Sequence, residues 1–279
     1  MRIDHESLIG TYEQKRAQVQ KFNLMHDNFF AIVMQHKEAL ETVLRILLQR
    51  NDLCVREVRV QYSMRNLVGH SSVLDVLAED HVGKLYNIEV QVRNEDDYQK
   101  RSRFYQSGID TGFLEKGRHY KDLPEVYLIF ITAFDLFGDG LVSYEVQRVL
   151  KSSGRVVDNG VHELYFNAKA TDDTEVSRLL QYFMHTDPEE TGFGSLSDTV
   201  RHYKNTEEGV SHVCDEVKRY GDERAAVAAE RAKAEARVQL VSNLMQNMNC
   251  TLEQALKNLG ISWEEYQGYI DCLSHRESA

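Results

Sequence analysis

Apolar residues recur with a helical spacing in the first part of the chain and with a strand-like spacing after it. Between Lys21 and Arg50 they return every three or four positions, which predicts one or two amphipathic helices packed on a core. After residue 52 the period becomes two, and Val58, Val60 and Tyr62 fall on one face of a predicted strand. The sequence Gly-His-Ser-Ser at residues 69–72 predicts a turn after that strand.

Two further strands are predicted at residues 73–78 and 84–92, with a hairpin connection between them. Alternation places Val73, Asp75 and Leu77 on one face of the first strand, so a carboxylate occupies a position where a core residue is expected. On the second strand, Glu89 and Gln91 project from the face opposite to an apolar row, which consists of Tyr86, Ile88, Val90 and Val92. The hairpin would bring Asp75 beside Glu89.

The rest of the chain alternates between helical and strand-like patterns. The predicted elements are a helix at 96–117, a strand buried on both faces at 125–132, strands at 142–149 and 161–167 joined by a turn at 158–160, and a helix at 173–184. We therefore expect an α/β core with a mixed sheet flanked by helices at 1–197. A long α-helical extension should follow at 198–248, and a small helical hairpin at 249–279.

The extension carries a repeat that alternates by four and three between Val213 and Met245. Such a repeat is typical of a coiled coil and predicts a homodimer through the C-terminal helices, but Arg224 and Arg231 both occupy seam positions. A solvated helix, or one that packs back on its own core, fits the same pattern. The terminal hairpin could be a DNA-reading helix-turn-helix, although residues 263–273 contain acids and neither Lys nor Arg.

Composition narrows the class of protein. The chain has 279 residues with 33 Lys and Arg against 44 Asp and Glu, a net charge of −11, so contact with nucleic acid must be local. No apolar run approaches the roughly 18 residues of a membrane span, and the first ten residues lack a signal-peptide core, so a cytoplasmic protein without membrane contact is expected. The four cysteines are scattered and are expected to be reduced thiols.

The strongest chemical signal is the group formed by Asp75, Glu89 and Gln91. Two carboxylates on neighbouring strands, with the backbone carbonyl of Val90 between the polar residues, form an oxygen-rich site suited to Mg²⁺. A metal held there can lower the pKa of a bound water and support attack on a phosphodiester. Spacing alone also fits ordinary acids on an exposed face of a hairpin.

The sequence around these residues, LDVLAEDHVGKLYNIEVQVRNEDDYQKRSRFYQSGID, resembles the PD-(D/E)XK nuclease superfamily, in its recombination-promoting nuclease or nuclease family transposase branch. The resemblance extends from FNLMHDNFF through LPEVYLIFITAFDLFGDGL to HELYFNAK. It implies a restriction-endonuclease-like core and a Mg²⁺-dependent DNA endonuclease, with Mn²⁺ able to substitute. It also implies a role in recombination or a mobile element, with Asp75, Glu89 and Val90 as metal ligands.

The E-x-K motif of the superfamily falls on Glu89-Val90-Gln91, so Gln91 replaces the motif Lys. Gln91 can orient a water by hydrogen bonding but carries no charge. The missing charge could come from Lys84, Lys100 or Arg101, or from a second metal ion. The alternative is a catalytically weak or silent member that acts as a DNA-binding or protein-interaction module.

The resemblance assigns two supporting roles, to Asp27 on the first helix and to Gln106 on the helix beside the hairpin. Asp27 could instead be a helix N-cap. Four basic residues follow the second strand of the hairpin and are candidate DNA phosphate contacts, with ordinary solvated surface as the alternative. They are Arg93, Lys100, Arg101 and Arg103.

Overall fold

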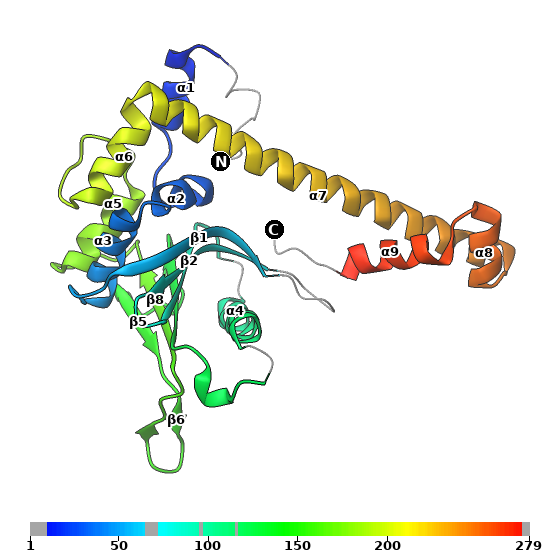
Figure 1. Cartoon of the computed structure of the whole chain (residues 1–279), viewed down its shortest axis with the longest axis horizontal. Helices are drawn as coiled ribbons and strands as arrows, with labels where there is room; N and C mark the ends of the chain where they lie inside the picture. Colours follow the sequence, from blue (N-terminus) through cyan, green and yellow to red (C-terminus); the bar gives the residue numbers. More distant parts are fainter. Residues whose placement is uncertain (1–9, 65–71, 95–96, 115–116, 275–279) are drawn as a thin grey trace. The chain divides into compact units, whose positions relative to one another are not determined.

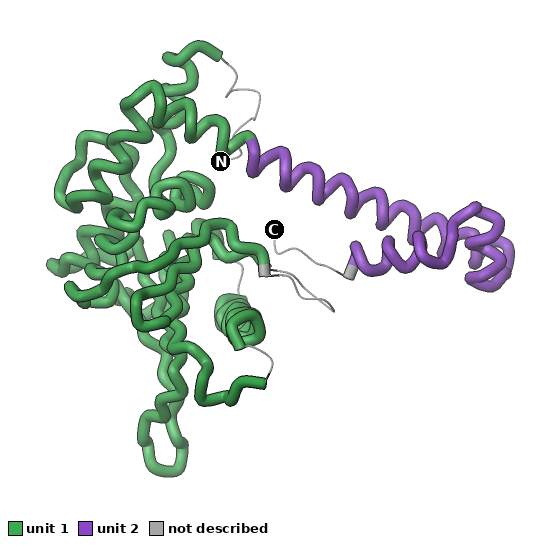
Figure 2. Tube along the Cα trace, viewed as in Figure 1, with its two compact units in different colours: residues 1–64, 73–218 green, residues 65–72, 219–279 purple. Residues whose placement is uncertain are grey.

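A computed structural model describes residues 10–64, 72–94, 97–114 and 117–274. The described residues fall into two compact units (Figure 2). The core unit contains those up to Met64 and from Val73 to Lys218, and the C-terminal unit contains those from Arg219 onward.

The core unit is built on a six-stranded sheet in the order β1-β2-β3-β4-β8-β5. β2 and β3 are antiparallel, β3, β4 and β8 are parallel, and β5 is antiparallel to β8, so the predicted mixed sheet is confirmed. The strands are β1 (Val55–Met64), β2 (Ser72–Asp80), β3 (Leu85–Gln91), β4 (Val126–Thr132), β5 (Ser143–Val146) and β8 (Val161–Asn167).

Helices cover both faces of this sheet (Figure 1). One face packs on the larger core with α2 (Asp27–Met34), α3 (Lys37–Leu48), α5 (Glu175–Met184) and α6 (Ser195–Asn205). The other face packs on α4 (Tyr98–Phe113), whose Tyr98, Tyr105 and Ile109 meet Leu128 and Phe130 of β4. α4 is the crossover between the parallel strands β3 and β4. A short helix that was not predicted, α1 (Tyr12–Val19), precedes α2.

The β2–β3 hairpin closes on a buried carboxylate. Asp80 accepts hydrogen bonds from the N–H groups of Val82 and Lys84, both at 2.9 Å, and from the Tyr86 hydroxyl at 2.9 Å. Gly83 has a left-handed conformation with φ of +84°, which residues other than glycine rarely adopt. The predicted hairpin is confirmed, whereas the turn expected at residues 69–72 lies mostly outside the described residues.

Two interruptions of the alternation distinguish the strands from the predicted pattern. In β1, Val58 and Val60 face the larger core but Tyr62 faces the α4 side, because Gln61 between them is left-handed with φ of 47°. In β2, Leu74 and Leu77 both face α4 while Val76 faces the larger core, so the regular alternation predicted for this strand is interrupted between Leu74 and Val76. One extra residue between Leu74 and Val76, as in a β-bulge, accounts for this change of side.

The expected pairing of the strands near 142–149 and 161–167 is confirmed, but the connection between them is not a simple turn. β5 ends at Val146, and a separate two-stranded ribbon, β6 (Val149–Leu150) with β7 (Arg155–Val156), lies between β5 and β8. Asp158 caps the turn at Gly160, where the chain returns to the sheet. Strands of two residues are too short to give a periodic signal in the sequence.

The helical region after residue 197 is not one continuous helix. α6 ends at Asn205, and α7 (Glu207–Met248) follows after Thr206. The hydroxyl of Thr206 caps α7 by accepting from the N–H of Gly209 at 3.0 Å. A Cβ on Gly209 would lie 2.4 Å from the His202 carbonyl oxygen, so only glycine allows the two helices to approach this closely. The compact core unit runs to Lys218 and so includes the start of α7.

A buried lysine ties α6 to two distant segments of the core unit. Lys204 is almost fully buried, and its ammonium donates to the backbone carbonyls of Phe22 and Thr186, the latter at 2.7 Å. Burial lowers the pKa of Lys204 to about 8. The carbonyl partners compensate part of the desolvation that an unpaired buried charge would suffer.

The C-terminal unit has a small apolar core of its own. The end of α7 packs with α8 (Leu252–Leu259) and α9 (Trp263–Ser274) around Val241, Leu256 and Ile261. The predicted caps of the helical hairpin form: Thr251 accepts from the N–H of Gln254, and Ser262 from that of Glu265. Of the predicted seam, Val213 and Val217 belong to the core of the first unit, while Val227 is exposed.

Candidate metal and phosphodiester site

Asp75 and Glu89 lie side by side on β2 and β3. The register of the two strands pairs Val76 with Ile88, which brings Asp75, the residue before Val76, beside Glu89, the residue after Ile88. The backbone N–H of Asp75 donates to the Glu89 Oε1 atom at 3.2 Å. The N–H of Val90 donates to the Asp75 Oδ2 atom at 3.1 Å, so the side chain of Asp75 takes the place of a ladder acceptor at the bulge.

The environment of Glu89 strongly disfavours its charged form. The side chain is 2% exposed, on the face of β3 that packs against α4. Burial raises the pKa of Glu89 well above its usual value, and the neighbouring carboxylate of Asp75 raises it further. Two adjacent carboxylates with a perturbed pKa are typical of a site that binds a cation or moves a proton.

The backbone of Val90 is oriented toward the same place. In a strand, the N–H and C=O of one residue point toward the same neighbouring strand. The Val90 N–H is directed at Asp75, whereas the carbonyl of Gln91 accepts from Ala133 beside β4, at 2.9 Å. The Val90 carbonyl therefore points toward Asp75, the direction that its predicted role as a metal ligand requires.

Gln91 lies on the same face as Glu89 and contacts an arginine of α4. The Arg101 Nη1 atom donates to the Gln91 Oε1 atom at 3.4 Å, and the Arg101 side chain is only 13% exposed. Arg101 also partly offsets the raised pKa of Glu89. Lys84 is at the other end of β3, where it pairs with Glu125 at 2.7 Å. Of the three basic residues that could supply the missing charge, Arg101 is therefore the one that contacts Gln91 and acts on the pKa of Glu89. Lys100 is exposed.

Sequence reasoning missed two buried polar residues beside the acids, Asn87 and Tyr105. Asn87 precedes Glu89 by two positions on the same face of β3, and it opposes part of the pKa shift of Glu89. Neither amide atom of Asn87 nor the hydroxyl of Ser102 meets hydrogen-bond geometry with any residue in the described part of the chain. The pKa of Tyr105 is raised by burial and by the nearby charge of Glu89. Asn87 lies two positions before Glu89 on the strand, and Tyr105 lies four positions after Arg101 on the helix. These spacings could have indicated both residues from the sequence.

The two residues with predicted supporting roles have hydrogen-bond partners on their own helices. Asp27 is the first residue of α2, a helix that packs against β1 and β3, and His26 occupies the N-cap position. Its carboxylate accepts from the N–H of Asn28 at 2.8 Å. Gln106 lies on α4 on the opposite flank of the buried stripe from Arg101, and its amide donates to Asp110 at 3.4 Å. These two hydrogen bonds therefore link neither Asp27 nor Gln106 to the acid pair.

The remaining predicted DNA contacts are on the surface. Arg93 follows β3, and Lys100 and Arg103 lie on α4; all three side chains are exposed. Together with the half-buried Arg101 they form a basic region along the start of α4, close in sequence to the end of β3. Exposed cations of this kind are suited to phosphate contact.

The donor set fits a hard divalent cation through oxygen atoms alone. It consists of the two carboxylates and the Val90 carbonyl, and the unpaired amide of Asn87 lies on the same face. Within the described residues, no group of three or more His, Cys, Asp or Glu side chains could hold a metal ion. A bound Mg²⁺ would therefore need waters or substrate oxygens to complete its coordination, as is common for this ion.

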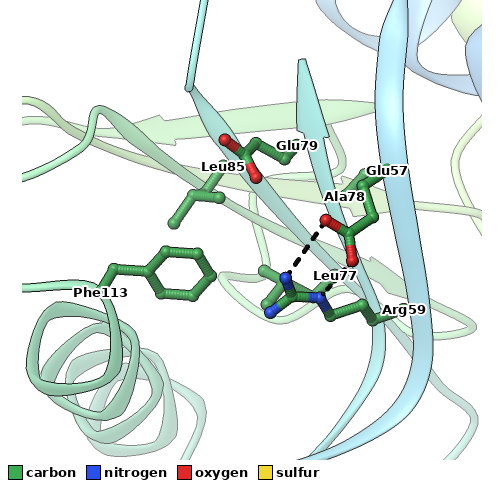
Figure 3. A pocket seen from close by; sticks show the side chains of 7 residues that line it. All are labelled: Glu57, Arg59, Leu77, Ala78, Glu79, Leu85 and Phe113. Carbon is green, nitrogen blue, oxygen red and sulfur yellow. Dashed lines mark hydrogen bonds and ion pairs between the residues drawn. The ribbon is translucent and has the colours of Figure 1, made fainter. Parts of the chain in front are cut away.

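A surface pocket of the same sheet includes neither of the two acids in its lining (Figure 3). It is lined by Glu57, Arg59, Leu77, Ala78, Glu79, Leu85 and Phe113. Leu85 precedes Glu89 by four residues, or roughly 13 Å along an extended strand. In the pocket, Arg59 is held by Glu57 at 2.8 Å and lies over the Phe113 ring. The charged residues that line the pocket are paired, Arg59 with Glu57 and Glu79 with Arg56, so this pocket is a structural feature.

The family model of the PD-(D/E)XK nuclease family transposases matches residues 35–176. These residues include the β2–β3 hairpin with its two acids, α4 and the parallel strands. The chain therefore belongs to the PD-(D/E)XK nuclease family transposases. No curated protein and no solved structure matches the chain. None of the helices in the described ranges has both the length and the apolar character that crossing a membrane requires.

Proposed function

We propose that this protein is a Mg²⁺-dependent DNA endonuclease that hydrolyses phosphodiester bonds. The observation that carries the proposal is the pair of adjacent carboxylates, Asp75 and Glu89, on the face of the sheet covered by α4. Membership of a nuclease family makes DNA the expected substrate. Promotion of recombination or a mobile-element function is the biological role that follows from the same proposal.

In this mechanism Asp75, Glu89 and the Val90 carbonyl would hold the metal ion. When bound, the ion would lower the pKa of a water and neutralise charge on the phosphate in the transition state. Burial and the neighbouring Asp75 raise the pKa of Glu89, so metal binding at this site would compete with protons. Mn²⁺ should substitute, because it accepts the same oxygen ligands.

Gln91 and Arg101 would act together in place of the motif Lys. The Gln91 carbonyl oxygen accepts from Arg101, so its amide nitrogen remains as the donor that holds a water or a phosphate oxygen. Arg101 provides the positive charge that Gln91 lacks, and its partial burial strengthens that charge toward a phosphate. Arg93, Lys100 and Arg103 would contact the DNA backbone, while Asp27 and Gln106 would support the catalytic site from α2 and α4.

Nicking of supercoiled DNA by the purified chain tests the proposal. Cleavage should require Mg²⁺ or Mn²⁺, and Asp75→Ala and Glu89→Ala should each lower the rate at least about a hundredfold, because a metal site contributes several kcal/mol to catalysis. Asp139→Ala, which removes an exposed acid of a loop, is the matched control and should cut normally. Undiminished cutting by Asp75→Ala would refute the assignment.

One observation favours the second candidate function, a catalytically silent DNA-binding module. Gln91 replaces the motif Lys, and the described residues provide only two acids at the candidate site. Such a protein would bind DNA equally well with and without Mg²⁺ and would cut it under neither condition.

In either case we propose that copies self-associate through the exposed middle of α7 around Val227, which light scattering over a range of concentrations would test.

A further inference from the structure

The ribbon formed by β6 and β7, defined as residues 147–157, is a feature that the proposed site does not use. It projects from the sheet between β5 and β8 (Figure 1). Every residue from Glu145 to Asn159 is exposed. Because these residues are exposed, the insertion adds no packing to the core. An isolated two-stranded hairpin is only marginally stable in water, so the ribbon does not stabilise the fold.

The ribbon has a charge opposite to that of the whole chain. It contains Arg148, Lys151 and Arg155, and residues 146–157 include no acid, whereas the protein has a net charge of −11. No hydrogen bond or ion pair joins these three side chains to any residue in the described part of the chain. Three cations without an ion-pair partner among the described residues, on a projecting element of an acidic protein, indicate a polyanionic partner.

The pairing of the strands determines how these side chains are arranged. Val149 pairs with Val156 and Leu150 with Arg155, and the N–H of Val157 donates to the Arg148 carbonyl at 2.8 Å. Residues opposite each other in an antiparallel pair share a face. Arg148, Leu150, Arg155 and Val157 therefore form one face, which combines two guanidinium groups with two apolar side chains.

The other face is apolar. Val149 and Val156 lie opposite each other and are 53% and 52% exposed. Exposed apolar side chains beside cations suit a partner that offers both anionic groups and apolar edges. A duplex groove has this character, since phosphates line it and thymine methyl groups project into it.

Dimensions and position agree with such a partner. From Val146 to Ser152 the ribbon can reach about 20 Å, and the major groove, about 12 Å wide, accommodates a two-stranded β-ribbon. The charge of Arg148 lowers the pKa of Asp110 on α4, although burial of that carboxyl is the larger effect and raises it. Arg148 is therefore close enough to α4 for its charge to act on Asp110, and α4 covers the side of the sheet on which Glu89 and Gln91 lie.

We propose that the ribbon at residues 147–157 is a DNA clamp that enters a groove of duplex DNA through Arg148, Lys151 and Arg155. It holds the duplex on the side of the sheet where Asp75 and Glu89 lie. The inference deepens the proposed function, on which its choice of partner rests, and it assigns the substrate class as double-stranded DNA.

Binding in EDTA, where no cutting occurs, tests the clamp. The full chain and the triple variant Arg148→Gln, Lys151→Gln, Arg155→Gln are titrated against a labelled duplex of about 20 base pairs and a single strand of equal length. The variant should bind the duplex at least tenfold more weakly near 0.1 M salt. Loss of three phosphate contacts should also reduce the slope of log K against log salt by about 2.7.

The matched control is Lys121→Gln, Lys169→Gln, Lys257→Gln, which removes three exposed cations elsewhere and should change duplex affinity less than twofold. Equal affinities of the two triple variants would overturn the proposal, and an equal loss toward single strands would overturn the assignment to a duplex groove. If wild type cuts DNA while the ribbon variant binds like the control, the clamp fails and the nuclease stands. If Asp75→Ala still cuts while the ribbon variant binds weakly, the clamp stands and the catalytic assignment fails.

Discussion

The acids at the two ends of the β2–β3 hairpin differ in how their charges are compensated. At the closed end, Asp80 has three hydrogen-bond donors, Glu79 pairs with Arg56, and Glu125 pairs with both Lys84 and His162. At the open end, Asp75 and Glu89 face each other, and the charge of Arg101 offsets only part of the raised pKa of Glu89. Compensated acids stabilise a fold, whereas adjacent carboxylates destabilise it unless something binds them. The hairpin therefore has a structural end and, in the proposed function, a reactive end.

The largest expected difference between the two ends is in cleavage. Asp75→Asn and Glu89→Gln keep the size of the side chain and remove its charge, so each should lower the nicking rate at least about a hundredfold. Asp80→Asn, the same chemical change at the closed end, should leave the rate of the folded protein within about threefold. Rates are compared per folded molecule, with circular dichroism as the check on folding. Equal losses at both ends would remove the distinction.

Stability should respond in the opposite direction. Asp80→Ala leaves the Tyr86 hydroxyl and two N–H groups without their acceptor, which should lower the free energy of unfolding by about 2–4 kcal/mol. Glu89→Gln, measured in EDTA near pH 7.5, should raise it by about 1–2 kcal/mol, because a disfavoured buried charge is removed. Urea denaturation measures both values. A destabilised Glu89→Gln protein would show that Glu89 has a structural role like that of Asp80.

The pH dependence of stability sharpens the same contrast. Because the folded pKa of Glu89 is raised, the native state of the metal-free protein binds more protons than the unfolded state above the ordinary pKa of Glu. The contribution of Glu89 is fully present below that value and is lost as pH rises through the raised pKa. Wild type in EDTA should therefore lose stability relative to Glu89→Gln as the pH rises above 4.5, the ordinary pKa of Glu. A constant difference between the two proteins would contradict the perturbed pKa.

The smallest expected effect concerns Gln91. Gln91→Lys should keep the wild-type cleavage rate or raise it severalfold, because the new side chain adds the cation of the superfamily motif. The gain is limited because the added charge lies beside Arg101, which carries the same charge. Gln91→Leu should be slower than both, since it loses the hydrogen bond to Arg101 and the donor to water. Single-turnover cleavage rates measure the series. Wild-type rates for Gln91→Leu would show that this side chain does not take part in the reaction.

The sequence predicted the sheet and the acid pair better than the details of either. Period-two patterns and a turn sequence were enough to place Asp75 beside Glu89, because the hairpin between them is short and local. The changes of side at Gln61 and near Asp75 were not predictable, since a bulge depends on pairing with the next strand. The proximity of Arg101 to Gln91 depends on how α4 packs, so spacing alone left Lys84, Lys100 and Arg101 equivalent.

The last part of the core unit determines when the chain can fold during its synthesis. The ammonium of Lys204 binds carbonyls at Phe22 and Thr186, and Val213 and Val217 of α7 complete the same apolar core. The segment matched by the nuclease family ends at residue 176, so a ribosome must add about 40 more residues before this core is complete. At 5–20 residues per second this takes roughly 2–8 s. During that interval the nascent chain carries both acids of the reactive end without the finished scaffold that holds them together.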